Sequence, residues 1–400
     1  MNLLTPGSHR AGSLVDDEAV VTALLRVEVA WAVALSEVGA ATAAQSEAIA
    51  KAVVDWRPDL AALITETEAA GNPVVPLVRA LRSAVADPAA RALVHRGLTS
   101  QDVLDTALIL VARDALRRIR TDLVTTAQTL GHLAREHGDS VMPGRTLTQY
   151  AVPITFGLKA AQWLAGVLDA LELATDSLTG LPVQCGGAAG TLALTNELTD
   201  DPSAAVAAFA RALELADPGV PWHTTRTAVT RLGHALVTVC DALGVIAADV
   251  LVLSRPEIAE VREGAVEGRG GSSTMPHKRN PVLSVLMRSA ALQAPLLGAQ
   301  LHLAAAQAVD ERPDGAWHSE WNALRTLLEL TVTAAAQSAE LIAGLEVDVD
   351  AMAHHVAEAA DDLLAERGSG GEPSTYLGSA GAFTDRVLDR LTATLEKESR

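Results

Sequence analysis

The segment LKAAQWLAGVLDAL, from Leu158 to Leu171, decides the fold class of this chain. Apolar residues recur in it every three or four positions, which is the period of one face of an α-helix: Leu158, Ala161, Leu164, Leu168 and Leu171. Alanines on the other faces permit close contact with neighbouring helices. The segment therefore predicts a long helix that is packed on more than one side.

Further stretches of comparable length extend this prediction along the chain. Together with the first, the predicted long helices span 103–136, 153–178, 224–253, 281–308 and 317–345. Pro295 lies inside the fourth, where the loss of a backbone hydrogen bond predicts either a kink or a break into two helices. Five long helices predict a central bundle, and their apolar faces indicate contacts with partner subunits as well.

The rest of the chain predicts shorter helices at both ends. Turn signals at Gly39 and Gly71 divide the first hundred residues, and GSGGEPS at 368–374 interrupts the charged region after Asp348. Aromatic residues make up only 3% of the chain while alanine and leucine dominate, so strand-forming residues are scarce. We therefore expect an all-α fold of three helical domains, at 1–102, 103–346 and 347–400.

Composition also limits the partners and the compartment. A formal net charge of −18 argues against a nucleic-acid partner, because phosphate binding needs a basic face. The N-terminus lacks a charged start followed by a long apolar run, and Asp249 interrupts the most apolar helix, which predicts a cytoplasmic protein without a membrane partner. Cys185 and Cys240 are expected to be buried apolar residues in a reducing compartment. Histidines and acidic residues do not cluster at ligand spacing, and neither a Walker loop nor a GxGxxG after a strand is present, so neither a metal nor an organic cofactor is expected.

A glycine-rich loop from Gly264 to Pro281 is the strongest candidate for an active site. It contains GSSTMPHKRNP at 271–281, in which a flexible backbone, hydroxyls, a cation and an amide follow one another. The glycines let the backbone open and shut over a ligand. Lys278 supplies positive charge, and Pro281 suits the first turn of a helix, whose N-terminus favours anions. The loop is therefore expected to bind a carboxylate rather than to serve as a linker, with Ser273 and Met275 among its substrate-binding residues.

A second candidate block is HRGLTSQDVLDTA at 95–107, directly before a predicted long helix. Thr99, Ser100 and Gln101 carry hydroxyl and amide groups that can bind carboxylate oxygens, while Asp102 suits the cap of the helix. The same residues also fit an ordinary capped helix start with a surface histidine, His95. Both interpretations stay open from these residues alone.

The third block is PGRTLTQYAVP at 143–153. Arg145 offers a guanidinium fork that can hold a carboxylate through two hydrogen bonds, and Thr146 and Gln149 follow it closely. For an isolated arginine at the start of a helix, a solvated charge is the alternative. We count these three residues among the predicted substrate-binding residues.

Together the blocks resemble the signatures of the fumarase/aspartase superfamily, which are GSSxMPxKxNP in the loop and TSxD followed by DTA in the second block. The resemblance covers most of the chain and implies a homotetramer with a helical core and active sites shared between subunits. It implies that Ser272 moves the carbon-bound proton and that Lys278 and Asn280 hold the substrate carboxylate. His95 stands where adenylosuccinate lyases carry a histidine, so it joins the predicted catalytic residues.

One position departs from the superfamily pattern. Many members read GRTH where this chain has Leu147, and in them the histidine helps the leaving group depart. A carboxylate leaving group, whose conjugate acid has a pKa of about 4, departs already ionised and needs no such acid. With further similarity in QCGGAAGTLA, PWHTTR and GAWHSEW, this departure makes the chain most like the 3-carboxy-cis,cis-muconate cycloisomerases.

That resemblance predicts an enzyme that interconverts 3-carboxy-cis,cis-muconate and 4-carboxymuconolactone by carboxylate addition and β-elimination, in the protocatechuate branch of the β-ketoadipate pathway. Two related reactions stay open: an adenylosuccinate lyase-like elimination, and loss of another good leaving group, such as nitrite from nitrosuccinate. A catalytically inactive structural or binding homologue is the alternative from a different class. In each enzymatic case the expected partner is a small polycarboxylate.

Overall fold

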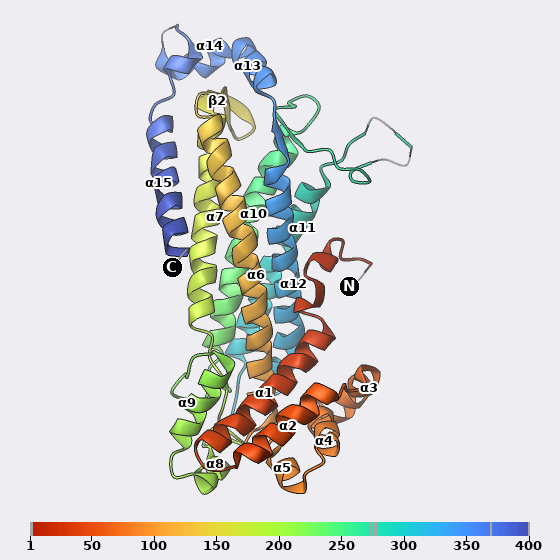
Figure 1. Ribbon diagram of the computed structural model, residues 1–400. Helices are drawn as coiled ribbons and strands as arrows, with labels where there is room; N and C mark the ends of the chain where they lie inside the picture. The colour runs from red at the N-terminus through yellow and green to blue at the C-terminus, as the bar shows by residue number, and fades with distance from the viewer. Residues whose placement is uncertain (1–2, 272–273, 276–277, 369, 399–400) are drawn as a thin grey trace. The chain divides into compact units, whose positions relative to one another are not determined.

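The computed structural model describes residues 3–271, 274–275, 278–368 and 370–398, and helices make up most of it (Figure 1). The α-helices are α1 (Asp17–Glu37), α2 (Ala43–Asp55), α3 (Leu60–Ala70), α4 (Val74–Ala84), α5 (Pro88–Leu93), α6 (Ser100–Glu136), α7 (Phe156–Thr179), α8 (Ala193–Leu198), α9 (Pro202–Leu213), α10 (Thr227–Leu253), α11 (Val282–Ala306), α12 (Gly315–Ala343), α13 (Val349–Glu358), α14 (Ala360–Leu363) and α15 (Ala380–Glu398). The strands are β1 (Val141–Thr146), β2 (Gln149–Thr155), β3 (Val261–Glu263) and β4 (Leu345–Val347). The predicted all-α class is confirmed.

Contacts within the chain divide it into two compact units. The first unit comprises residues 1–117, 176–234 and 297–329, and the second comprises 118–175, 235–296 and 330–400. The five predicted long helices are present as α6, α7, α10, α11 and α12, and each contributes residues to both units. The three domains predicted from the sequence, with limits at 102 and 346, stay a prediction.

The first unit contains α1, in which apolar residues such as Leu24, Val27 and Leu35 are buried. Asp16 caps this helix by accepting a hydrogen bond from the backbone N–H of Ala19 at 2.8 Å. Trp31 is 0% exposed, and its ring packs edge-on against Phe209 of α9 with ring centroids 5.6 Å apart. The indole N–H of Trp31 donates to the backbone oxygen of Arg96 at 2.7 Å, so α1 also fixes the chain just before α6.

In the second unit, parts of the five long helices form a bundle. The hydroxyl groups of Thr126 on α6 and Ser338 on α12 lie 2.9 Å apart within hydrogen-bonding distance. Gly244 of α10 is so close to α11 that an added Cβ would lie 2.5 Å from Cβ of Ala291. Small residues therefore permit close helix contact here, as the alanine-rich sequence predicts.

Asp249, the charge that interrupts the most apolar helix, is paired inside this bundle. Its carboxylate accepts a hydrogen bond from Nε1 of Trp163 at 2.7 Å and one from Nζ of Lys159 at 3.3 Å. Both donors belong to α7. The charge is therefore satisfied across the contact between α7 and α10.

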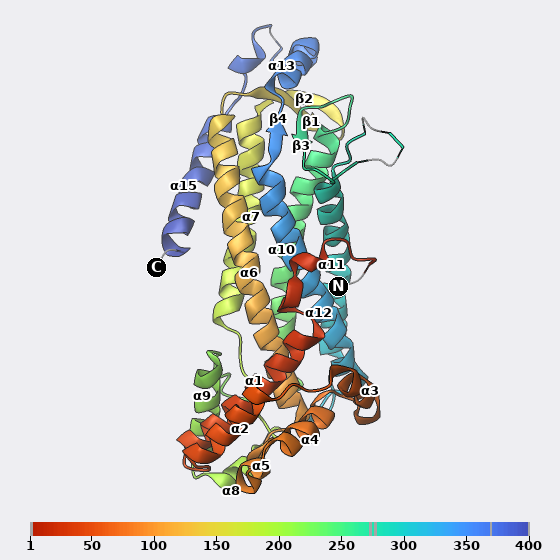
Figure 2. The ribbon, with the colours of Figure 1, turned by 45° about the vertical axis from the view of Figure 1, so that its right-hand side comes forward.

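The C-terminal helix packs along the second unit. In two views α15 lies beside α6 and α7 (Figure 1, Figure 2). Arg390 forms ion pairs with Asp169 and Glu172 of α7 at 2.6 and 3.2 Å. Gly131 of α6 leaves room for Leu391, whose side chain would lie 2.4 Å from a Cβ at that position.

The structure corrects the helix predicted over 153–178. Residues 141–155 form an antiparallel hairpin of β1 and β2, in which Thr146 pairs with Gln149, and α7 begins only at Phe156. The two-residue turn consists of Leu147 and Thr148, whose φ angles are both positive at 49° and 72°. Two-residue hairpin turns of this kind favour asparagine and glycine, so the sequence carries no hairpin signal here.

Two further expectations differ from the structure. The helix α11 runs without interruption through Pro295, so the alternative of a break into two helices is wrong. The helix predicted over 317–345 ends at Ala343, because residues 345–347 form β4 and pair antiparallel with β3.

Candidate active site

The predicted site residues belong to both compact units. The first unit holds His95, Thr99, Ser100 and Gln101, and the second holds Arg145, Thr146, Gln149, Met275, Lys278 and Asn280. Ser272 and Ser273 lie outside the described residues. Each unit therefore contains its own set of candidate residues.

In the first unit, a buried glutamate holds His95 in one orientation. Nδ1 of His95 lies 2.7 Å from Oε1 of Glu28, and Glu28 is only 1% exposed. The backbone of His95 has a positive φ of 62°, which is uncommon for residues other than glycine and recurs at functional sites. Because Glu28 engages Nδ1, Nε2 is the ring atom that His95 can offer to a ligand.

Asp102 is fully buried in the first turn of α6 and ties this helix to the glycine-rich segment at 184–193. Its carboxylate accepts hydrogen bonds from the backbone N–H groups of Thr99, Gly186 and Gly187, each at 2.9 Å. Nε2 of His223 lies 2.7 Å from the same carboxylate. A Cβ at Gly186 would lie 2.8 Å from the His223 ring, so only glycine fits there. Asp102 thus lies inside the first turn rather than at the predicted cap position, stabilises the helix start through the N–H of Thr99, and fixes a second segment as well.

Two residues of this block lie within or at the edge of the core. Gln101 is 0% exposed and donates through Nε2 to the backbone oxygen of His223 at 2.9 Å. The structure packs this side chain inside the unit, and its predicted contact with substrate stays a prediction. Ser100, the first residue of α6, is half-buried.

Arg312 is a candidate that no sequence pattern indicates. Its guanidinium donates to the hydroxyl of Thr99 and to the backbone oxygen of Ala188, the latter at 3.2 Å. Thr99 lies 213 residues away in the chain, so the contact has no local signature. Arg312 brings a positive charge to the Thr99 block, where a carboxylate is expected to bind.

A buried ion cluster lies one helical turn further along α6. Arg226 donates to Asp105 at 2.7 and 3.0 Å and to Glu320 at 2.7 Å, and Nε1 of Trp317 adds a bond to Asp105 at 2.9 Å. All three charged side chains are at most 4% exposed. Burial lowers the pKa of Arg226, but the two carboxylates outweigh it, so the pKa is raised overall. The guanidinium therefore stays charged and neutralises part of the cluster.

The raised pKa of Glu320 leads us to predict that folding stability depends on pH. Burial is the largest cause, and together with repulsion from Asp105 it raises the pKa of Glu320 more than Arg226 lowers it, so the folded chain retains this proton to a higher pH than the unfolded chain. The contribution of Glu320 to the free energy of unfolding therefore falls as pH rises from about 4.5 through the raised pKa. In urea titrations from about pH 4 to pH 7, the stability of wild type minus that of Glu320→Gln should decline with pH. A difference that is constant over this range would contradict the assignment.

In the second unit, the guanidinium of Arg145 is already occupied. It forms a bidentate ion pair with Glu260 at 2.7 and 2.9 Å, and it lies 5.5 Å from the ring centroid of Tyr150. Burial lowers the pKa of Arg145, but the pair with Glu260 outweighs this, so the pKa is raised. The fork that we expected to hold a substrate carboxylate therefore holds Glu260 instead. Thr146 and Gln149 are exposed at the hairpin tip, as a substrate-binding role requires.

The glycine-rich loop from Gly264 to Pro281, called the signature loop below, is closed at its described base by Asn280. Both its backbone N–H and its side-chain Nδ2 donate to the backbone oxygen of Gly270, at 2.8 and 3.1 Å. A Cβ at Gly270 would lie 2.6 Å from the backbone oxygen of Asn280, so glycine is required. Lys278 and Met275 are exposed on the same loop. The amide of Asn280 therefore holds the loop, and the ligand-binding role of Lys278 stays a prediction.

The N-terminus of α11 is also occupied from within the chain. The carboxylate of Glu263 accepts hydrogen bonds from the backbone N–H groups of Leu283 and Ser284 at 3.2 and 2.7 Å, and from the Ser284 hydroxyl at 2.7 Å. This corrects the expectation that the helix N-terminus after Pro281 is free to bind a substrate anion, because an internal carboxylate already takes its first-turn donors.

The cysteines are buried thiols, as predicted. Cys185 and Cys240 are 3% and 1% exposed and form no disulfide. Burial raises the pKa of both, to about 12 for Cys240, which keeps the metal-binding thiolate form rare near neutral pH. Among the residues that the structure describes, no three His, Cys, Asp or Glu side chains are grouped so as to hold a metal ion.

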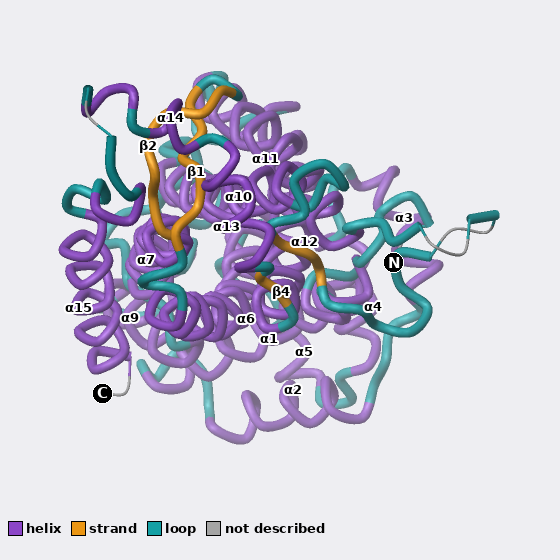
Figure 3. Tube along the Cα trace, turned by 90° about the horizontal axis from the view of Figure 1, so that it is seen from above, coloured by secondary structure: helices purple, strands orange, loops and turns teal. Residues whose placement is uncertain are grey.

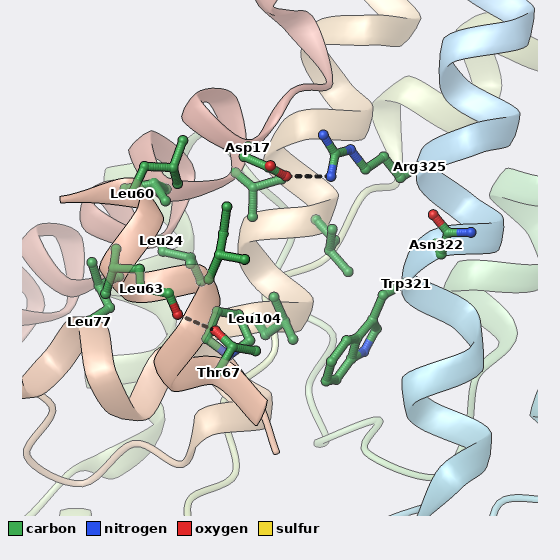
Figure 4. Close-up of a pocket in the computed structure, with 15 residues that line it drawn as sticks. Asp17, Leu24, Leu60, Leu63, Thr67, Leu77, Leu104, Trp321, Asn322 and Arg325 are labelled. Atoms are coloured by element: carbon green, nitrogen blue, oxygen red, sulfur yellow. Dashed lines mark hydrogen bonds and ion pairs between the residues drawn. The ribbon is translucent and has the colours of Figure 1, made fainter. Parts of the chain in front are cut away.

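A separate apolar pocket of about 290 Å³ lies in the first unit (Figure 4). Leucines of α1, α3 and α6 line it, and Trp321 of α12 forms part of its wall. The ion pair between Asp17 and Arg325, at 2.5 Å, stands at its edge. None of the predicted catalytic residues lines this pocket, so we do not assign the chemistry to it.

Comparisons with known proteins match this chain to one family and to relatives with two different named activities. The sequence profile of a family described as Lyase matches residues 12–296. The nitrosuccinate lyase of Streptomyces davaonensis is 46% identical over 91% of this chain and 79% of that protein. The 3-carboxy-cis,cis-muconate cycloisomerase of Bradyrhizobium diazoefficiens is 40% identical over 91% of this chain and 82% of that protein. The crystal structure of the 3-carboxy-cis,cis-muconate lactonizing enzyme from Pseudomonas putida superposes with a TM-score of 0.86 at 32% identity, covering 94% of this chain and 96% of that one.

Proposed function

Because this chain belongs to the lyase family of the fumarase/aspartase superfamily, we propose that it catalyses a β-elimination from a small polycarboxylate in which the expelled fragment departs as an anion. In this reaction a base removes a proton from the carbon next to a carboxylate, and the electrons of that C–H bond form the new double bond. The leaving group takes the electrons of the bond that breaks.

The tip of the β1–β2 hairpin carries the observation that supports an anionic leaving group. Leu147 is 95% exposed there, and the described residues from Arg145 to Tyr150 include no histidine and no carboxylic acid. An apolar residue at this position cannot protonate a departing group. Carboxylate and nitrite are both stable as anions near neutral pH, whereas a departing amine needs a proton.

In the proposed mechanism Ser272 removes the proton from carbon. An unassisted serine is a weak base, so the alkoxide needs a nearby positive charge or backbone amides. Lys278, exposed on the same loop, supplies that charge in this proposal and also meets the carboxylate on which negative charge develops. Asn280 holds the base of the loop through Gly270 and thereby places Lys278.

Nitrosuccinate is the first candidate substrate. The S. davaonensis nitrosuccinate lyase shares 46% identity with this chain, against 40% for the muconate cycloisomerase over the same share of the chain. Breaking one C–H bond and the C–N bond of nitrosuccinate releases nitrite and an unsaturated dicarboxylate, and Ser272 takes the proton. The lactonisation of 3-carboxy-cis,cis-muconate, which the sequence predicted first, is the second candidate, supported by the TM-score of 0.86 to the P. putida enzyme.

Parallel assays separate these candidates. With nitrosuccinate we expect nitrite and alkene to appear in equal amounts, measured by diazo coupling and by ultraviolet absorbance. Loss of the 3-carboxymuconate diene absorbance without nitrite release would assign the cycloisomerase reaction instead. Release of fumarate from adenylosuccinate would contradict the anionic leaving group, and binding without turnover of any of the three compounds would favour an inactive homologue.

We propose that further copies of this chain complete the active site, as the family resemblance implies. Val285, Leu292 and Leu296 of α11 are 49%, 66% and 73% exposed, and their spacing places them on one face of the helix. By length and composition α1, α10 and α11 could each cross a membrane, but we assign the exposed faces to contacts between copies. Light scattering should give the mass of four chains of 41.6 kDa. A fully active single chain would contradict this proposal.

A further inference from the structure

A buried carboxylate joins three separate segments of the second unit. Oε1 of Glu260 lies 2.7 Å from Nη2 of Arg145 and 2.9 Å from Nδ1 of His355, while Oε2 lies 2.9 Å from Nη1 of Arg145. The Glu260 side chain is 0% exposed. Arg145 belongs to β1, Glu260 directly precedes β3, and His355 belongs to α13. A carboxylate without access to water is stable only with such partners, so the three side chains form one unit of structure.

The backbone of Glu260 is fixed as firmly as its side chain. Its N–H donates to the oxygen of Leu253 at the end of α10, at 2.9 Å, and its own oxygen accepts from the N–H of Asp348 at 3.0 Å. The next residues form β3 and pair with β4. Figure 2 shows β1, β2, β3 and β4 gathered at one end of the second unit, with α13 beside them, and Figure 3 shows α13 near β1 from above.

The same segment leads directly into the signature loop. Glu263, the last residue of β3, binds the first turn of α11, where the loop ends. Gly264 then passes so close to Gly344 that a Cβ there would lie 2.4 Å from the Gly344 oxygen. Glu260 therefore stands between the hairpin on one side and the base of the loop on the other.

The hairpin needs such an anchor, because its turn is strained. Leu147 and Thr148 both have positive φ angles, which bulky and β-branched residues rarely adopt. Strained turns persist only where the surrounding structure holds them. The bidentate pair with Arg145, two residues before Leu147, is the strongest polar contact that the structure shows within the described hairpin.

We propose that Glu260 is a positioning residue, which holds the hairpin tip at Thr146 to Gln149 in a fixed place relative to the base of the signature loop. His355 contacts the same carboxylate and so links α13 to Glu260 as well. The inference rests on the proposed function, which gives both the hairpin tip and the loop a role in catalysis. It assigns Arg145 to this anchor rather than to direct contact with substrate.

The test compares Glu260→Gln with a matched control. The substitution keeps the shape of the side chain but removes its charge, so the bidentate pair is lost. If the hairpin shifts by about 1 Å, kcat should fall on the order of 10- to 100-fold, with a smaller change in KM. Arg145→Lys keeps the charge without the fork and should show an intermediate loss. The control is Arg262→Gln, which removes the exposed ion pair with Asp348 at 3.0 Å between the same segments and should behave as wild type.

Hydrogen exchange separates positioning from general support and needs no substrate. In Glu260→Gln, faster amide exchange should be confined to residues 141–155. Equal acceleration throughout the second unit, or a kcat equal to that of wild type, would overturn the proposal. If the wild type turns over none of the candidate substrates, the proposed function fails, and the exchange measurement alone still decides whether Glu260 anchors the hairpin.

Discussion

Replacing Ser272 with alanine should lower kcat by roughly 10²- to 10⁴-fold, the usual contribution of a positioned proton-transfer group. The expected cause is the loss of the only atom that the mechanism uses to take the proton from carbon. Because the change removes a single hydroxyl, the thermal unfolding temperature and the binding of substrate should stay close to those of wild type. Turnover is measured with saturating substrate, and binding by calorimetry with the inactive variant.

Ser273→Ala is the matched control for this experiment. It removes the same hydroxyl from the neighbouring position, to which we assign substrate binding, so it should raise KM more than it lowers kcat. A Ser272→Ala variant with near-normal kcat would show that another group takes the proton. If only Ser273→Ala lost turnover, the two assignments would be exchanged.

The second large effect concerns the buried cluster around Arg226. Replacing Arg226 with methionine leaves Asp105 and Glu320 without their common partner in a site that is almost closed to water. Breaking a buried pair in this way should lower the free energy of unfolding by about 3–5 kcal/mol. The control Arg211→Met removes an ion pair with Glu37 whose side chains are 61% and 52% exposed, and it should cost about 0–1 kcal/mol. Urea titration of both variants measures the difference.

A combined variant tests the cause of this loss. If unpaired charge is responsible, adding Asp105→Asn and Glu320→Gln to Arg226→Met should recover part of the stability, since neutral groups are less costly to bury. No recovery would indicate that the shape and hydrogen bonds of the guanidinium matter more than its charge.

The long helices could be predicted from the sequence because their apolar period is local. The stripe from Leu158 to Leu171 lies in α7, and the limits of all five long helices differ from the prediction by three residues or fewer. The residues predicted to open α7, from 153 to 155, belong to the hairpin instead. The hairpin could not be predicted, because its turn of Leu147 and Thr148 lacks the glycine or asparagine that usually marks such turns.

The site was predictable as a set of residue types but not as a set of contacts. The sequence indicates the charge of Arg145, yet the pair with Glu260 joins positions 115 residues apart, and no local pattern encodes it. In the same way Asp102 could be expected at the start of α6, whereas its bond to Gly186, 84 residues away, depends on the tertiary fold. Buried polar groups select their partners in three dimensions, so their roles follow only from the structure.

The bond between Glu263 and the first turn of α11 has an evolutionary consequence. It joins β3 to α11 on either side of the loop from Gly264 to Pro281, so these two elements stay linked whatever exposed residues the loop carries between its required glycines. Insertions or exchanges inside the loop should then alter which molecules are accepted without disturbing the scaffold. Replacing part of this loop is therefore a short route to new chemistry on the same scaffold.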